Sequence, residues 1–265
     1  MDPVLDFAIQ LARRAGQFLS GRFQALDNEI SLKPDRSVVT QADLASDRLI
    51  REAIQHDYPD DLYLSEELQP VLDEFPAASM PSIWVVDPLD GTTNFSLGLP
   101  IWGVLLCRLV AGWPDTAVLY FPMLDELYTA QRGRGAYRNG EKLVLRMEDK
   151  DRLISFFACC SRTFRRYQVN IPFKPRILGS AAYNLCCVAR SIAVLSFDAS
   201  PKIWDIAGAW LLLNEAGGYI QTYDSSRPFP VSTGLEYARL NYPVIAGATP
   251  EVVARWRQEI QLRPK

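Results

Sequence analysis

Hydrophobic residues recur at helical spacing near the start of the chain. They predict a first amphipathic helix that ends near Gly21, with an apolar face made of Val4, Ala8, Leu11, Ala12, Ala15, Phe18 and Leu19. After a polar turn over residues 33–37, a second helix is predicted to begin at Thr40, with an apolar face of Leu44, Ala45, Leu49, Ile50, Ala53 and Ile54. Strand patterns at 101–110, 116–121 and 126–131 precede Asn139-Gly140, a pair suited to a hairpin turn. The first half therefore predicts an α+β arrangement with an antiparallel sheet.

The second half has a different pattern of hydrophobic and polar positions. Short apolar runs at 153–158, 176–178, 192–197 and 244–248 alternate with helical patterns at 181–189, 203–215 and 250–262. Thr249 before Pro250 is typical of a helix start. The alternation predicts a layered α/β unit with a partly parallel sheet. We expect a boundary near Lys150, with residues 1–150 and 151–265 packed together as one functional unit.

Composition narrows the function. The chain has 265 residues, of which 48% are hydrophobic, and a net charge of -3 that disfavours a general nucleic-acid binder. No apolar run approaches the roughly 20 residues that span a bilayer, so we expect a cytoplasmic protein without a membrane partner. The five cysteines form no CxxC pair and are interpreted as reduced, packed thiols.

The most informative segment is 87–95, where an apolar strand pattern gives way to two acids, a glycine and two threonines. Pro88 has no N–H to give to a ladder, so the strand is predicted to turn there. Gly91 lets the backbone approach a ligand closely, and the amides of Gly91, Thr92 and Thr93 suit an anion. Acids beside N–H donors favour a cation between them, although an acidic turn is the simpler alternative.

The type of cation follows from what the chain lacks. His56 is the only histidine, which disfavours histidine-rich zinc sites and a Ser-His-Asp triad. Oxygen ligands remain, and they suit magnesium, which is often shared between carboxylates and a substrate phosphate.

Each of the other acids, taken alone, has a structural explanation that requires no ligand. Glu66, in Ser65-Glu66-Glu67, is interpretable as part of a solvated loop. Asp205 lies in the first turn of a predicted helix, where the helix dipole stabilises it. Asp43, in Thr40-Gln41-Ala42-Asp43, has the form of a capping-box acid.

Together, however, the blocks DPLDGTTNF, SEE, VTQAD and WDIAGAWLLLNEAGG resemble, in order, the signatures of the inositol monophosphatase family of magnesium-dependent, lithium-sensitive sugar phosphatases. The resemblance covers essentially the whole chain. It implies a layered αβαβα sandwich, assembled as a homodimer, with two or three Mg²⁺ ions per active site.

By this resemblance, the metal ligands are Glu66, Asp87, the carbonyl of Leu89, Asp90 and Asp205. Asp87 would bridge two ions, while Glu66 and Thr92 would orient the attacking water and Asp43 would hold the Thr92 hydroxyl. The phosphate would lie on the amides of Gly91, Thr92 and Thr93. No protein nucleophile is needed.

The resemblance also implies substrate contacts, from Asp90 and Asp205 and from Gly179, Ser180, Ala181 and Asp198. Asp198 is shorter than the glutamate that the family usually carries there. Ser65, Leu68 and Pro201 also depart from the family pattern, in loops around the substrate.

We therefore expect a phosphate monoester hydrolase acting on a small phosphorylated polyol or sugar, with myo-inositol monophosphate first. Fructose 1,6-bisphosphate, histidinol phosphate and 3′-phosphoadenosine 5′-phosphate are the alternatives within the family. A catalytically silent metal-binding or partner-binding homologue is the alternative outside enzymes. Nucleic-acid binding through Arg132, Arg134 and Arg138 is disfavoured, because these arginines suit a solvated hairpin edge.

Overall fold

The computed structural model describes residues 2–25, 30–32, 38–68, 80–145 and 155–264. Its helices are α1 (Pro3–Ala25), α2 (Gln41–Asp57), α3 (Thr92–Ser96), α4 (Thr163–Arg166), α5 (Ala181–Ala189), α6 (Ile203–Glu215) and α7 (Pro250–Arg257), with short 3-10 turns at Pro122–Leu124 and Tyr237–Arg239. The strands of the first half are β1 (Ile30–Leu32), β2 (Val38–Thr40), β3 (Leu62–Ser65), β4 (Ile83–Asp90), β5 (Gly103–Val110), β6 (Trp113–Phe121), β7 (Glu126–Gln131), β8 (Gly135–Arg138) and β9 (Glu141–Leu143). Those of the second half are β10 (Phe156–Cys159), β11 (Tyr167–Val169), β12 (Lys174–Arg176), β13 (Ala193–Asp198), β14 (Tyr219–Thr222), β15 (Val244–Gly247) and β16 (Ile260–Leu262).

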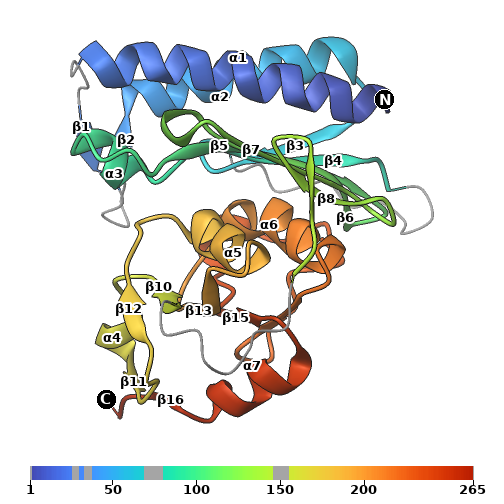
Figure 1. Ribbon diagram of the computed structural model, residues 1–265. Coiled ribbons are helices and arrows are strands. Elements are labelled where there is room, and N and C mark those ends of the chain that lie inside the picture. The colour runs from blue at the N-terminus through green and yellow to red at the C-terminus, as the bar shows by residue number, and fades with distance from the viewer. Residues whose placement is uncertain (1, 26–29, 33–37, 69–79, 146–154, 265) are drawn as a thin grey trace.

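Helices and sheets alternate in layers (Figure 1). Helices α1 and α2 cover the outer face of the larger sheet, α5 and α6 lie between the two sheets, and α7 covers the far side of the smaller sheet. This arrangement confirms the predicted α/β class and the αβαβα sandwich.

The larger sheet runs through its described strands in the order β3-β4-β5-β6-β7-β8-β9. All neighbours are antiparallel except β3 and β4, which are parallel. Strand β4 is buried along its whole length, and successive residues face opposite layers. Trp84 and Val86 pack with α1 and α2, whereas Ile83 and Val85 pack in the core with α5 and α6. An unbroken apolar run suits a strand covered on both faces.

The smaller sheet has the order β12-β10-β13-β15-β14 among its described strands. Strand β10 is parallel to both β12 and β13, while β15 is antiparallel to β13 and β14. The predicted partly parallel sheet is therefore confirmed. The turn at Asn139-Gly140 joins β8 to β9, and both residues have positive φ, as the hairpin prediction requires.

Three boundaries were predicted wrongly. Strand β4 does not turn at Pro88 but runs on to Asp90, because a shift in its register against β5 removes the need for a ladder bond at the proline. Helix α7 ends at Arg257, and the residues predicted to continue it form β16, which pairs with β11. Helix α1 continues past Gly21 to Ala25. The predicted turn at 33–37 and the boundary at Lys150 lie outside the described residues, so the division into two subdomains stays a prediction.

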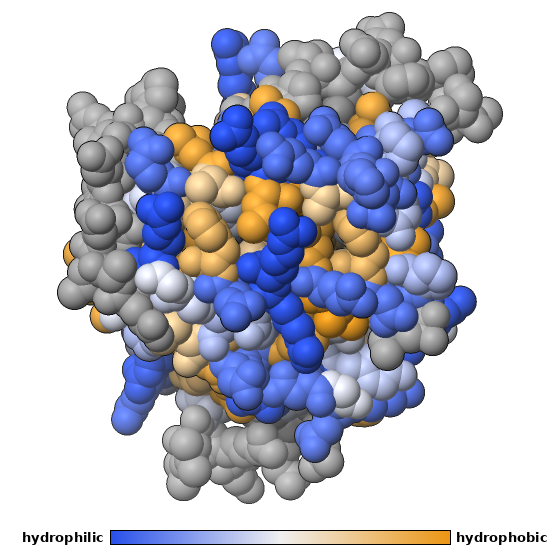
Figure 2. Space-filling model, turned by 90° about the horizontal axis from the view of Figure 1, so that it is seen from above, coloured by the Kyte–Doolittle hydropathy of each residue, from blue (hydrophilic) through white to orange (hydrophobic). Residues whose placement is uncertain are grey.

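The face formed by α1 and α2 is mostly polar, with hydrophobic side chains showing between the polar ones (Figure 2). This is the pattern of amphipathic helices that bury one side against a sheet. None of the described helices has the length and apolar character needed to cross a bilayer.

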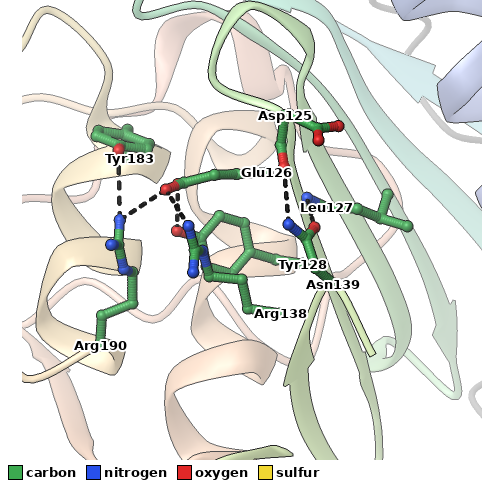
Figure 3. Close-up of polar contacts among 8 residues, drawn as sticks. All are labelled: Asp125, Glu126, Leu127, Tyr128, Arg138, Asn139, Tyr183 and Arg190. Carbon is green, nitrogen blue, oxygen red and sulfur yellow. Dashed lines mark hydrogen bonds and ion pairs between the residues drawn. The ribbon is translucent and has the colours of Figure 1, made fainter. Parts of the chain in front are cut away.

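A buried carboxylate joins the larger sheet to the helix layer beneath it (Figure 3). Glu126 of β7 is 5% exposed and accepts bonds from Arg138 of β8 at 2.7 Å and Arg190 at the end of α5 at 2.8 Å. The hydroxyl of Tyr128 donates to its second oxygen at 2.6 Å. Since two guanidinium groups surround one carboxylate, the negative charge of Glu126 is fully compensated inside the protein.

Candidate metal and phosphate site

The end of β4 presents two carboxylates that are almost completely buried, Asp87 at 1% and Asp90 at 6% exposure. The irregular register between them lets both side chains leave the strand at its end. The amide of Leu89 donates to Asp87 at 3.0 Å, and the hydroxyl of Ser46 on α2 donates to the carbonyl of Pro88 at 3.0 Å. Helix α2 thus fixes the backbone from which both acids project.

Two more acids reach this strand end from distant parts of the sequence. Glu66 directly follows β3, which runs parallel to β4, and its amide donates to the carbonyl of Val86 at 3.2 Å. Asp205 lies in the first turn of α6 and caps it by accepting a bond from the Lys202 amide at 2.7 Å. Parallel pairing and a helix start therefore bring Glu66 and Asp205 to the predicted site.

Burial and the neighbouring negative charges raise the pKa of the three aspartates. Burial raises the pKa of Asp87 and of Asp90 well above the ordinary range, and neighbouring carboxylates, including Glu66 and Asp205, raise both further. Burial and then the charge of Glu66 raise the pKa of Asp205 to about 7. The charge of Lys202 lowers the pKa of Asp205, but burial and the charge of Glu66 outweigh it.

The donor set fits a hard divalent cation, because it consists of carboxylate and carbonyl oxygens without nitrogen or sulfur. As the described side chains stand, no three acids, histidines or cysteines are gathered closely enough to hold one ion. Holding an ion with Asp87, Asp90, Asp205 and Glu66 would therefore require their carboxylates to move closer together, against mutual repulsion.

A second pair, Asp43 and Thr92, lies beside the cluster. Thr40 and Asp43 form the predicted capping box at the start of α2. One oxygen of Asp43 accepts from the amide and hydroxyl of Thr40, at 2.8 and 2.5 Å, and the other accepts from the Thr92 hydroxyl at 3.1 Å. The Thr92 hydroxyl also lies 3.0 Å from the carbonyl of Leu89. Burial raises the pKa of Asp43 to about 6. Asp43 is thus both a helix cap and a partner of Thr92.

The start of α3 supplies the expected N–H donors. Gly91 precedes the helix with φ of 86°, and a Cβ there would come within 2.8 Å of the carbonyl of Ile101. The first amides of a helix have no partners within it, so those of Thr92 and Thr93 are suited to an anion.

Asn94 in the same turn donates to the carbonyl of Leu178 at 2.8 Å and fastens the next segment, at Gly179, against the site.

Of the residues predicted to contact substrate, those of the second half and Asp205 line one pocket of about 250 Å³, whereas Asp90 and residues 91–93 are not part of its lining. Its lining comprises Cys160, Ser161, Arg162, Ile177, Gly179, Ser180, Ala181, Asp198, Ser200, Pro201 and Asp205. The Ser180 hydroxyl donates a short hydrogen bond to Asp90 and caps α5 by accepting from the Tyr183 amide at 2.9 Å. Ser180, a predicted substrate residue, is thus hydrogen-bonded directly to Asp90, a predicted metal ligand.

Asp198 is buried and fixed by several hydrogen bonds, which the sequence did not predict. It is 1% exposed, and it accepts from Asn184 at 3.0 and 3.3 Å and from Ser196 at 3.1 Å. Burial raises its pKa to about 7.

Sequence reasoning did not find Ser46, Asn94 or Asn184. Asn94 and Asn184 carried weak signals, since Asn94 lies in the acidic block and Asn184 lies one helical turn after Ser180. Ser46 shows only as one polar residue on α2.

Fold and site together define a layered α/β protein with a buried oxygen-ligand cluster beside an anion-binding helix start. The chain belongs to the inositol monophosphatase family, whose model matches residues 1–254. It is 34% identical to the Nus factor SuhB of Escherichia coli K12, over 84% of this chain and 86% of that protein. It is 30% identical to inositol monophosphatase 1 of Sus scrofa, over 98% and 95% respectively. A solved IMPase of Thermotoga maritima, 25% identical, matches with a TM-score of 0.77 over 97% of this chain and 98% of that one. The chain is thus a member of a phosphatase family with that family's fold.

Proposed function

We propose that the protein is a magnesium-dependent phosphate monoester hydrolase that uses water as the nucleophile. The observation that carries the proposal is the convergence of Glu66, Asp87, Asp90 and Asp205 at one strand end, beside the helix start at Gly91. The buried carboxylates need a cation, and the amides need an anion. A metal with a phosphate ester satisfies both requirements.

Glu66, Asp87 and the carbonyl of Leu89 would hold one ion, and Asp87, Asp90 and Asp205 a second. Bound Mg²⁺ would supply an acidified water and stabilise the attacking and leaving oxygens of an in-line displacement.

Thr92 and Glu66 would orient the water. A threonine hydroxyl has one proton, and donating it to Asp43 leaves the oxygen lone pairs of Thr92 free to accept from water. Both groups beside the Thr92 hydroxyl, Asp43 and the carbonyl of Leu89, are acceptors, so its one proton is engaged and its lone pairs stay available to the water. Glu66 would accept the proton that the water loses as its oxygen bonds to phosphorus, while the P–O bond to the alcohol breaks and the departing alkoxide takes a proton from solvent. Because water is the nucleophile, no covalent enzyme intermediate is needed.

The amides of Gly91, Thr92 and Thr93 would hold the phosphate oxygens. Gly179, Ser180, Ala181 and Asp198 would face the alcohol part of the ester, as residues of the pocket that adjoins Asp205. An acid at Asp198 suits the hydroxyls of a polyol, and we propose myo-inositol monophosphate as a substrate. Sugar bisphosphates, histidinol phosphate and 3′-phosphoadenosine 5′-phosphate remain the alternative esters.

The test is phosphate release from this panel with Mg²⁺, with and without lithium. Rapid hydrolysis of inositol monophosphate, inhibited by lithium, is expected. Negligible turnover of inositol monophosphate beside rapid turnover of another ester would refute the substrate.

If no ester releases phosphate, the proposed enzymatic activity is refuted and the catalytically silent homologue is supported. The relatives named Nus factor make this alternative worth testing. A homodimer and a cytoplasmic location also stay predictions, and light scattering tests the dimer.

A further inference from the structure

Asn94 joins two parts of the proposed site that are distant in the sequence. It lies in α3, the short helix that begins after Gly91, and it is buried, with 8% exposure. Its side-chain amide donates to the carbonyl of Ile101 at 2.7 Å and to that of Leu178, 84 residues further along the chain, at 2.8 Å. Figure 1 shows α3 beside the larger sheet and α5, which follows Leu178, in the layer beneath. Asn94 therefore ties one layer to the next.

The two carbonyl partners fix the orientation of the Asn94 side chain. Carbonyl oxygens accept hydrogen bonds and cannot donate them, so the NH₂ side of the amide must face them, and its two protons match the two acceptors. The backbone carbonyl of Asn94 accepts in turn from the amides of Leu97 and Leu99, at 3.2 and 2.8 Å. One residue thus holds both the turn after α3 and the segment at Leu178.

Gly179 lies directly against the Asn94 amide. Its φ is 82°, and a Cβ on Gly179 would come within 2.5 Å of Asn94 Nδ2 and 2.6 Å of Oδ1. Glycine leaves room for this contact and adopts this φ without strain. The next residue, Ser180, donates to Asp90 and caps α5 by accepting from the Tyr183 amide. Two adjacent contacts therefore fix this segment to the end of β4.

These contacts set the spacing between the two ends of a bound ester. Under the proposed function, the amides of residues 91–93 hold the phosphate, and residues 179–181 face the alcohol. One ester must fit both groups at once, and a misplacement of about 1 Å can lower a rate about a hundredfold. Asn94 lies at the hinge between the two groups, because it belongs to the phosphate-binding turn and bonds to the alcohol-facing segment.

We propose that Asn94 is a positioning residue that holds the alcohol-facing segment at a fixed place relative to the phosphate-binding turn, and so determines which esters are hydrolysed. An ester whose alcohol reaches residues 179–181 then depends on Asn94, whereas an ester too small to reach them does not. This inference rests on the proposed function and adds a residue that governs its substrate preference.

The test compares the best polyol or sugar ester of the panel with methyl phosphate, whose alcohol is too small to reach residues 179–181. Asn94→Ala should lower kcat/KM for the larger ester about thirtyfold and for methyl phosphate less than about threefold. Asn94→Asp should show the same selective loss without leaving a cavity, because it keeps the volume but replaces both donors by an acceptor.

Two further variants show whether the loss is selective. Thr92→Ala should slow both esters alike, because its proposed role is toward the water. Asn214→Ala, which changes an exposed asparagine on α6, should slow neither.

Hydrogen exchange gives a second readout that needs no turnover. The amides of Tyr183 and Asn184 bond to the hydroxyl and the carbonyl of Ser180. In Asn94→Ala and Asn94→Asp they should exchange about tenfold faster, since the segment that carries their acceptors is released. The amides of Ala42 and Asp43 at the start of α2 should keep their wild-type exchange rates and so report that the fold is intact.

Equal losses for the two esters in the Asn94 variants, or no loss for either, would overturn the inference. So would unchanged exchange at Tyr183 and Asn184, because Asn94 would then not hold the segment. If the wild-type protein hydrolyses neither ester, the proposed function fails, while the exchange rates still decide whether Asn94 fixes the segment.

Discussion

At two of the places where the protein buries carboxylates, it treats their charge in opposite ways. Glu126 is enclosed by Arg138, Arg190 and the hydroxyl of Tyr128. Asp87 and Asp90 have further acids as neighbours instead, and burial together with these negative charges raises their pKa values. Burial of an ionised group is costly unless a partner compensates it.

Under the proposed function, the difference distinguishes Glu126 as a structural carboxylate from Asp87 and Asp90 as metal ligands. The protein supplies the partners of Glu126 and thereby joins β7 and β8 to α5. At the end of β4 it leaves the positive charge to be supplied from outside. Removing a carboxylate should therefore damage stability at the first place and activity at the second.

Asp87→Asn gives the largest expected effect. It removes the proposed bridge between two ions, so phosphate release should fall roughly a thousandfold. The metal-free variant should be at least as stable as the wild type, because a source of repulsion has been removed. Activity assays and calorimetry check this, with the exposed Asp60→Asn as the control. A folded variant with normal activity would contradict the assignment.

Glu126→Gln should have the reverse consequence. It leaves the guanidinium groups of Arg138 and Arg190 without their carboxylate, which should lower the free energy of unfolding by about 3 kcal/mol. The kcat of the folded protein should stay nearly unchanged. Urea denaturation measures the loss, and Glu141→Gln on exposed β9 is the matched control. A stable but inactive Glu126→Gln would mean that the two clusters are not separate in function.

Thr92→Ala tests how the acidic site acts on water. Loss of the hydroxyl that Asp43 orients should lower kcat about a hundredfold and change KM far less. Steady-state kinetics on the best ester of the panel provide the measurement. An unchanged kcat would refute the role of Thr92, whereas Thr92→Ser should retain most of the rate.

The contrast between the two clusters was only partly predictable from the sequence. The Thr40–Asp43 capping box and the Asp87–Asp90 pair are local patterns, and both lie where they were predicted. Glu66 reaches the same place through parallel pairing of β3 with β4, which no local pattern encodes, so only the family resemblance indicated its role.

The Glu126 cluster was not predicted at all. Its partner Arg190 directly follows α5, 64 residues further along the chain. No local sequence pattern indicates which distant residue will pair with a charged side chain on a strand. The error at Pro88 has a similar origin. Proline excludes a regular ladder position, but tertiary packing can insert a bulge that tolerates it.

The central claim, that the acidic cluster needs an external cation, predicts a particular pH dependence. The folded-state pKa is raised to about 6 for Asp43 and to about 7 for Asp198 and Asp205. Acids whose pKa is raised by folding contribute stability below their unfolded pKa, and this stability is lost as pH rises through the folded pKa. The metal-free protein should therefore lose stability between about pH 4 and about pH 8.

The most direct test is the Tm of the metal-free protein at about pH 5 and about pH 8, each with and without Mg²⁺. We predict that Mg²⁺ raises the Tm by about 5 °C or more at the higher pH, that the rise is much smaller at the lower pH, and that Asp87→Asn abolishes it. A Tm that Mg²⁺ leaves unchanged at the higher pH, or raises equally in Asp87→Asn, would contradict the account.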